Sequence, residues 1–149
     1  MASPPPHTCE DRIKHLEFIQ NAILRMAGNS FLLKGWSITI AAAFFALAAK
    51  NSRPGFALLA LFPTLSFWGL DAYYLRLERL FRELYDEVRL LPDEELSEKI
   101  GPFSLQTGSE SGGVGSWFQA LFSGSVVWLH VTIVVSIAAL ALALFFGRA

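Results

Sequence analysis

The sequence predicts an all-α membrane protein with three transmembrane helices, an N-terminal amphipathic helix and a cytoplasmic helical extension of the second span. Of its 149 residues, 53% are hydrophobic, and most of these fall into three blocks at 31–49, 55–70 and 125–146. A bilayer core of about 30 Å needs roughly 20 helical residues. The third block meets this length alone. The first meets it if Lys34 reaches the headgroups, and the second if it continues to residue 75.

The segment 56–91 is predicted to be one helix whose solvent changes along its length. Its first part, FALLALFPTLSFWGL, carries no charge, whereas the following DAYYLRLERLFRELYDEVRLL is charged on one face and apolar on the other. Such a segment is expected to lie partly in lipid and partly in water. A soluble enzyme is therefore not the default expectation. Pro63 should kink the membrane part because proline lacks an N–H.

The chain before the first span divides into a tail and a helix. Residues 1–8 are expected to be a disordered tail, since its three consecutive prolines resist helix formation. Thr8 and Asp11 have the spacing of a capping box at the start of an amphipathic helix over 9–30. Its apolar side is predicted from three–four spacing to contain Ile13, Leu16, Ile19, Ile23, Met26 and Ala27. His15 is expected on the solvated side. The sequence Gly-Asn-Ser at 28–30 is either a break or a weak point in a continuous helix.

The remaining elements follow in order. The first span is predicted over 31–50 and the second over 55–75, joined by a short turn into an antiparallel hairpin. Residues 76–91 continue the second span as a cytoplasmic helix. Residues 92–116 are acidic and then Gly- and Ser-rich, which predicts a flexible linker. An interfacial segment over 117–124 leads into the third span, 125–146.

The cytoplasmic helix carries apolar residues at alternating three–four spacing, which is a heptad seam. The predicted assembly seam is Leu77, Phe81, Leu84 and Val88. It should pack with the N-terminal helix, within one subunit or between subunits. Two short helices are not expected to satisfy this seam alone, so a homo-oligomer is expected.

The distribution of basic residues predicts the orientation of the chain. Three of them flank the other side of the predicted membrane: Lys50, Arg53 and Arg148. The other nine lie in the N-terminal segment and the long second loop: Arg12, Lys14, Arg25, Lys34, Arg76, Arg79, Arg82, Arg89 and Lys99. The N-terminus is therefore expected in the cytoplasm and the C-terminus outside, in a bacterial inner membrane.

No catalytic constellation is visible, and the protein is not expected to be an enzyme. Cys9 is the only cysteine, so neither an intrachain disulfide nor a cysteine-based metal site is expected. No cofactor and no metal are expected.

Lys34, Asp71 and His130 are expected at similar depth near the cytoplasmic ends of the three spans. One interpretation is an interfacial Lys34–Asp71 ion pair with His130 hydrogen-bonded nearby. The other is that these groups line or gate an ion path, because ionisable groups within spans tend to face cavities.

Small and hydroxyl-bearing residues form a second candidate group. Ser37 on the first span, and Thr132 and Ser136 on the third, are either helix-packing residues or hydroxyls that line a narrow pore. Three spans cannot enclose a pore, so conduction would require an oligomer.

Arg76, Arg79 and Arg82 recur every three residues along the cytoplasmic helix. They are either a solvated face paired with glutamates or a phosphate-binding stripe, since a guanidinium group grips phosphate with two hydrogen bonds.

Two stretches carry a family resemblance: EFIQNAILRMAGNSFLLKGWSITIAAAFFAL and FPTLSFWGLDAYYLRLERLFRELYDEVR. Together they resemble small membrane proteins of bacterial nucleotide-signalling anti-phage systems, including SLATT-like effectors and the channel subunit of Hailong-type systems. The resemblance covers roughly residues 17–90. Two-span SLATT patterns lack the third span that this chain has. The resemblance implies a helical membrane oligomer whose conductance is controlled by a nucleotide or a short oligonucleotide.

Two functions from different classes follow. The first is an oligomeric ion channel or pore controlled by a cytoplasmic signal. The second is a non-conducting membrane anchor that recruits a soluble partner through its cytoplasmic helices. The expected partners are membrane lipid, further copies of the chain, a nucleotide or short oligonucleotide, and a soluble protein of the same defence system.

Overall fold

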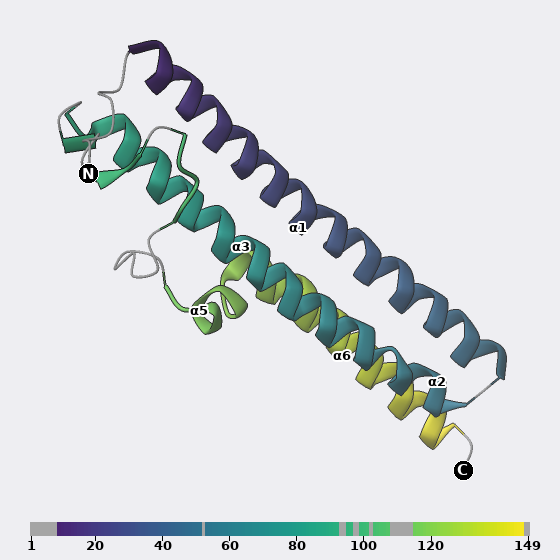
Figure 1. Cartoon of the computed structure of the whole chain (residues 1–149). Coiled ribbons are helices and arrows are strands. Elements are labelled where there is room, and N and C mark those ends of the chain that lie inside the picture. Colours follow the sequence, from purple (N-terminus) through teal and green to yellow (C-terminus); the bar gives the residue numbers. More distant parts are fainter. Residues whose placement is uncertain are drawn as a thin grey trace. The chain divides into compact units, whose positions relative to one another are not determined.

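The structure is a computed structural model that describes residues 9–51, 53–92, 95–96, 99–101, 103–107 and 115–147 (Figure 1). These residues form the helices α1 (Cys9–Asn51), α2 (Pro54–Leu59), α3 (Leu61–Leu90), α5 (Trp117–Leu121) and α6 (Gly124–Phe146), and the described part contains no strand. The predicted tail, 1–8, and the Gly-rich part of the predicted linker, 108–114, lie outside the described residues.

Three helical segments are long and apolar enough to cross a membrane. They are Cys9–Asn51, Pro54–Leu90 and Gly124–Phe146. The fold class predicted from the sequence is therefore confirmed: the chain is an all-α, multi-pass membrane protein. The boundaries differ from those expected in two places.

The first difference is the length of α1. This helix runs without interruption through Gly28, Asn29 and Ser30, so the predicted helix over 9–30 and the first span form one element. The three residues have weak helix propensity, but a long flanking helix on both sides compensates for a local weak point.

The second difference is in the second span, which is two helices rather than one. The chain is helical to Leu59, turns at Ala60 and resumes at Leu61. Proline at position 63 has no N–H for the carbonyl four residues earlier, so the helix is interrupted within one turn of it, as expected for a kink. The Ala60 carbonyl oxygen accepts both the Thr64 N–H at 3.2 Å and the Thr64 hydroxyl at 2.7 Å, on the turn that follows the interruption.

The chain divides into two compact units. The first unit contains the described residues within Met1–Gly28 and Leu75–Gly115, and the second those within Asn29–Tyr74 and Ser116–Ala149. Helices α1 and α3 each contribute to both.

In the first unit, the N-terminal part of α1 packs against the C-terminal part of α3. The buried core consists of Ile19, Ile23, Leu84, Val88 and Leu96. The predicted seam residues Leu84 and Val88 are thus buried within a single chain. Phe81 is partly buried against the same core. As expected, the two helices do not complete this core alone: Leu96, from beyond α3, is part of it, so the core is completed within one chain rather than by a second subunit.

The segment that supplies Leu96 was expected to be a flexible linker. We call its described residues within 92–107 the strap. Its Ser104 carbonyl oxygen bonds His15 Nε2 at 2.7 Å, and the Phe103 ring lies edge-on to Phe18 at 5.8 Å. At these residues the expected linker therefore packs against the first unit.

The strap also changes the surroundings of the N-terminal helix. His15, expected in solvent, is fully buried beneath the strap, whereas Ile13, expected on the apolar side, is 54% exposed. The rest of the predicted apolar side is buried or partly buried as expected, and the strap covers a second face that helical periodicity could not reveal.

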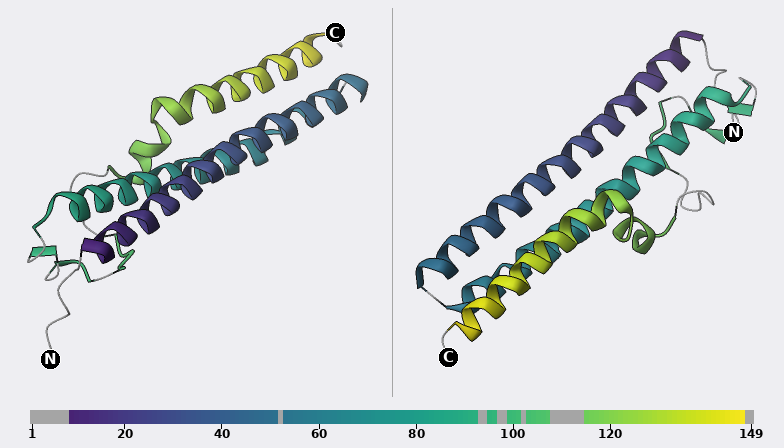
Figure 2. Two further views of the ribbon diagram at one scale, coloured as in Figure 1. Left: turned by 90° about the horizontal axis from the view of Figure 1, so that it is seen from above. Right: turned by 180° about the vertical axis from the view of Figure 1, so that it is seen from behind.

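In the second unit, α2 lies beside α6 (Figure 2). The buried centre of this contact consists of small side chains: Ala57 of α2 packs with Ala141 of α6 and Ala48 of α1, and larger side chains are partly buried around them. Small residues allow close backbone approach between helices in lipid, where the hydrophobic effect between helices is absent.

The face of α6 that packs within the chain differs from the expected one. It consists of Val126, His130, Ile133, Ile137 and Ala141. The expected packing residues Thr132 and Ser136 lie on another face, where Thr132 is exposed and Ser136 is partly buried.

Candidate functional site

The candidate site lies in the second unit around Asp71 of α3. The Asp71 side chain is fully buried, although it lies on a helix that is otherwise uncharged from Leu61 to this point. A buried carboxylate is costly unless it is paired and hydrogen-bonded. The residues that compensate for this cost define the site.

Two side chains of α1 contact one oxygen of this carboxylate. Lys34 Nζ donates to Asp71 Oδ1 at 2.7 Å and to Ser30 Oγ at 2.7 Å. Ser30 Oγ in turn donates to the same Oδ1 at 2.5 Å. Ser30 and Lys34 are four residues apart, so they lie on one face of α1 and converge on Asp71.

The second carboxylate oxygen is surrounded differently. Among the described residues, Asp71 Oδ2 is buried and accepts no hydrogen bond. His130 Nδ1 of α6 lies 3.9 Å from this oxygen, beyond hydrogen-bond distance. Asp71 Oδ1 therefore accepts two hydrogen bonds, whereas Oδ2 accepts none among the described residues.

His130 is fully buried. Its Nδ1 donates to the Val126 carbonyl oxygen at 3.0 Å, and because a carbonyl oxygen only accepts, Nδ1 carries a hydrogen. His130 Nε2 is buried and has no hydrogen-bond partner in the described part of the chain. The ring stacks on Trp68 with centroids 5.8 Å apart and planes 9° apart. Together these contacts fix the imidazole between α3 and α6.

Two tryptophans connect this region to α5. Trp68 Nε1 donates to the Leu121 carbonyl oxygen at 3.0 Å, and Trp117 Nε1 donates to the Gly69 carbonyl oxygen at 3.2 Å. The two bonds run in opposite directions between α3 and α5, so α5 is fastened beside the Asp71 site. Indole N–H groups usually find such partners when they are buried.

The structure thus brings together three of the six residues expected at a pore or gate: Lys34, Asp71 and His130. We call these three, with Ser30, the Asp71 site. The expected Lys34–Asp71 ion pair is confirmed. His130 lies nearby, but its hydrogen bond is to its own helix.

The other three expected residues are not part of the site. The hydroxyls of Ser37, Thr132 and Ser136 each donate to the carbonyl oxygen four residues earlier in their own helix. Ser37 is buried, whereas Thr132 is exposed.

Two residues at or beside the Asp71 site, Ser30 and Trp68, were not predicted from the sequence. Ser30 was treated as part of a weak point in the helix, although it lies four residues before Lys34. Trp68 lies three residues before Asp71 on α3, so helical spacing could have placed both side chains on the same face. The stacking partner on α6 could not have been found, because it depends on how α6 is rotated.

The candidate phosphate ligands Arg76, Arg79 and Arg82 lie in the first unit, whereas the residues of the Asp71 site lie in the second. Arg82 binds Glu78 Oε1 through Nε at 3.0 Å and Nη2 at 2.7 Å. Arg76 is half-buried, and its Nε has no hydrogen-bond partner among the described residues. Arg82 is therefore engaged within its own helix, which is the solvated-face interpretation for that residue.

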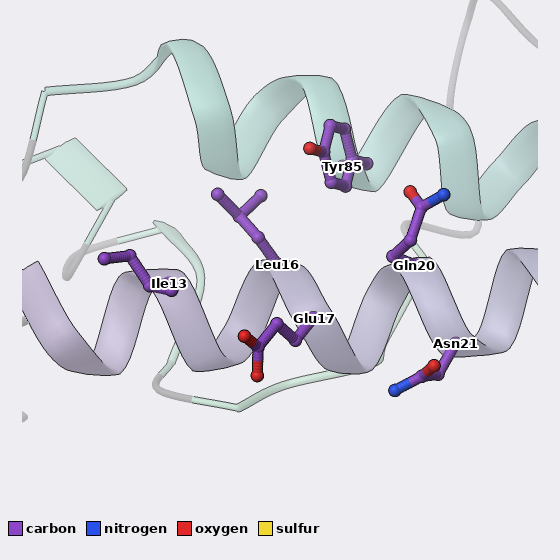
Figure 3. A pocket seen from close by; sticks show the side chains of 6 residues that line it. All are labelled: Ile13, Leu16, Glu17, Gln20, Asn21 and Tyr85. Atoms are coloured by element: carbon purple, nitrogen blue, oxygen red, sulfur yellow. The ribbon is translucent and has the colours of Figure 1, made fainter.

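The first unit also carries an open groove between α1 and α3. It has a volume of about 520 Å³, and its lining side chains are shown in Figure 3: Ile13, Leu16, Glu17, Gln20, Asn21 and Tyr85. A second hollow of about 330 Å³ shares Gln20 and Tyr85 with it and reaches Leu24 and Arg82. The groove runs along the helix pair and is lined by both apolar and polar groups.

The part of the chain that the structure describes contains no group of three or more His, Cys, Asp or Glu side chains that could hold a metal ion. Comparisons of the chain with protein-family models, with curated proteins and with solved structures found no match.

Proposed function

We propose that the protein forms an oligomeric ion channel or pore whose state is set by a signal on its cytoplasmic side. The observation that carries this proposal is the Asp71 site, a buried ion pair with a neighbouring imidazole among helices long and apolar enough to cross a membrane. Ionisable groups at such positions are costly, and they commonly mark ion paths or gates.

Oligomerisation is part of the proposal because three spans cannot enclose a pore. The face of α6 with Thr132 and Ser136 is turned away from the core of its own chain. Small and hydroxyl-bearing residues on such a face favour close packing against another helix in lipid. In the proposed homo-oligomer this face meets a second subunit or the central axis.

We place the protein in a bacterial inner membrane, with the N-terminus in the cytoplasm and the C-terminus outside, because of the bias of basic residues. The first unit is then cytoplasmic and receives the signal. The resemblance to anti-phage membrane proteins suggests a nucleotide or a short oligonucleotide as this signal, with Arg76, Arg79 and Arg82 as candidate phosphate ligands. At Arg82, phosphate would have to displace Glu78.

Ion flux from liposomes tests the proposal. Vesicles that contain the purified protein are loaded with K⁺, and K⁺ efflux is measured both without additions and with nucleotides or short oligonucleotides. At least one of these conditions should give efflux above that of empty vesicles. The variant Asp71→Asn should change the rate several-fold. The control Ser66→Ala should not, because Ser66 is exposed on the same helix and bonds only to its own backbone among the described contacts. Absence of flux under every condition, from correctly folded protein, would contradict a channel.

A second candidate function is a non-conducting anchor that recruits a soluble partner. It is favoured by the groove of the first unit, beside which Ile13 and Leu24 are 54% and 60% exposed. An anchor should lose its partner when either residue becomes glutamate, whereas Leu90→Glu, at another exposed position of this unit, should have no effect. Retention of the partner by both groove variants would contradict the anchor.

A further inference from the structure

The Asp71 site has the form of a cation-binding site that is occupied by a side chain of the protein. A carboxylate oxygen of Asp71 and the hydroxyl oxygen of Ser30 both lie 2.7 Å from Lys34 Nζ. Oxygen atoms of this kind also bind hard metal cations. The ammonium group of Lys34 is thus a cation, tethered to the protein, in an oxygen-lined site.

The two partners differ in how firmly they are held. Asp71 is completely buried and is fixed by the Ser30 hydroxyl, whereas the Lys34 side chain remains 24% exposed. Lysine carries its charge on a flexible four-carbon stem that can extend toward water. Lys34 is therefore the partner that can leave, and Asp71 is the one that must stay.

The departure of Lys34 would leave a buried carboxylate without a counter-charge. His130 cannot take over without movement, because its Nδ1 is 3.9 Å from Asp71 Oδ2 and donates to Val126. Asp71 Oδ2 is already buried and unpartnered among the described residues. A buried carboxylate in this state attracts any small cation that can reach it.

We infer that Asp71 and Ser30 form a binding site for a monovalent cation such as Na⁺ or K⁺, which the Lys34 ammonium occupies in this structure and vacates when the site loads. A monovalent ion fits better than a divalent one because the site offers a single carboxylate. The inference deepens the proposed function by naming the ion, and any role in conduction rests on that function. Binding itself can be tested without a current.

The test compares thermal unfolding of the purified protein in NaCl, in KCl and in tetramethylammonium chloride at equal ionic strength. The variant Lys34→Ala should melt several degrees higher in NaCl or KCl than in tetramethylammonium chloride, because a cation that binds only the folded state stabilises it. The wild-type protein, whose own ammonium fills the site, should show a smaller difference. The double variant Lys34→Ala/Asp71→Asn should show none.

Methylammonium chloride provides a second measurement on Lys34→Ala. Methylammonium resembles the missing side-chain end and should raise the melting temperature above that in tetramethylammonium chloride, whose cation is bulkier and has no N–H donor. If Lys34→Ala does not fold, Lys34→Gln replaces it in both measurements. Equal melting temperatures of the variant in all these salts would overturn the inference. A melting temperature that rises only when the pH is lowered would also overturn it, since Asp71 would then be neutralised by a proton and not by a cation.

The two proposals fail in different ways. Cation-dependent melting without ion flux would contradict the channel and support the site. Ion flux with melting temperatures that are the same in every salt would contradict the site and leave the channel standing.

Discussion

Asp71 shows how a single residue can organise a membrane unit. Its carboxylate is buried, and the contacts from Ser30 and Lys34 on α1 compensate for much of its desolvation. A buried ion pair adds little net stability compared with apolar residues, but loss of one partner is expensive because the other charge stays buried. The cost should therefore depend on which partner is lost.

This asymmetry gives a prediction for stability. The variant Lys34→Met should lower the free energy of unfolding by about 3–5 kcal/mol, because it leaves the Asp71 carboxylate alone. Asp71→Asn should cost less, since Lys34 is 24% exposed and can extend toward water. Unfolding followed by far-ultraviolet circular dichroism, in detergent without alkali cations, measures both. A greater loss for Asp71→Asn than for Lys34→Met would contradict the role given to Asp71.

Single residues also show how far sequence reasoning reached. Lys34 and Asp71 could be paired in advance because both are isolated charges near the same ends of two spans in a predicted hairpin. His15 could not be placed, since its hydrogen-bond partner Ser104 lies 89 positions later in the chain. Local periodicity contains no information about such a distant cover.

At the scale of elements, prediction was best where apolar runs are long. The three spans and the all-α class follow from length and hydropathy alone. The continuity of α1 and the turn at Ala60 depend on the balance between weak helix formers and their flanks, which sequence leaves open. On α6, Thr132 and Ser136 were expected to pack against a helix or to line a pore, and the core within the chain contains Ile133 and Ile137 instead.

The C-terminal end of α3 carries a contact that no motif indicated. Arg12 Nε donates to the Val88 carbonyl oxygen at 2.9 Å, and Nη2 donates to those of Arg89 and Leu91 at 2.9 and 2.6 Å. The last carbonyl groups of a helix lack partners within the helix, and a cation there also interacts favourably with the helix dipole. Arg12 therefore caps α3 from α1.

A substitution at this cap tests its contribution. Arg12→Ala should destabilise the first unit by about 1–3 kcal/mol, because three hydrogen bonds from a charged group are lost. Arg12→Lys should recover only part of this, since an ammonium group lacks the planar fork that reaches several carbonyls. Amide hydrogen exchange at residues 84–91 measures the effect. Unchanged protection in Arg12→Ala would show that the cap is not needed.

At the scale of the whole molecule, the chain combines two kinds of unit. The second unit has alanine-rich contacts and one buried ion pair, whereas the first is held together by aliphatic residues and the strap. In the function proposed above, the second unit contains the ion path and the first unit receives the signal.

The proposed orientation can be tested with the single cysteine, which is exposed at the start of α1. In intact spheroplasts, Cys9 should resist a membrane-impermeant maleimide and should react after permeabilisation. The variant Cys9→Ser/Phe146→Cys moves the thiol to an exposed position near the end of α6 and should react without permeabilisation. The opposite labelling pattern would invert the topology and place the first unit outside the cell.

Single-channel recording in planar lipid bilayers tests the central claim most directly. Wild-type protein should give discrete current steps in KCl, and Asp71→Asn, inserted to the same extent, should change the size of each step. The matched control Ser66→Ala should keep the wild-type step size. Folded wild-type protein that gives no steps above those of an empty bilayer, both without additions and with nucleotides or short oligonucleotides, would contradict a channel. Equal steps from wild type and Asp71→Asn would remove the Asp71 site from the ion path.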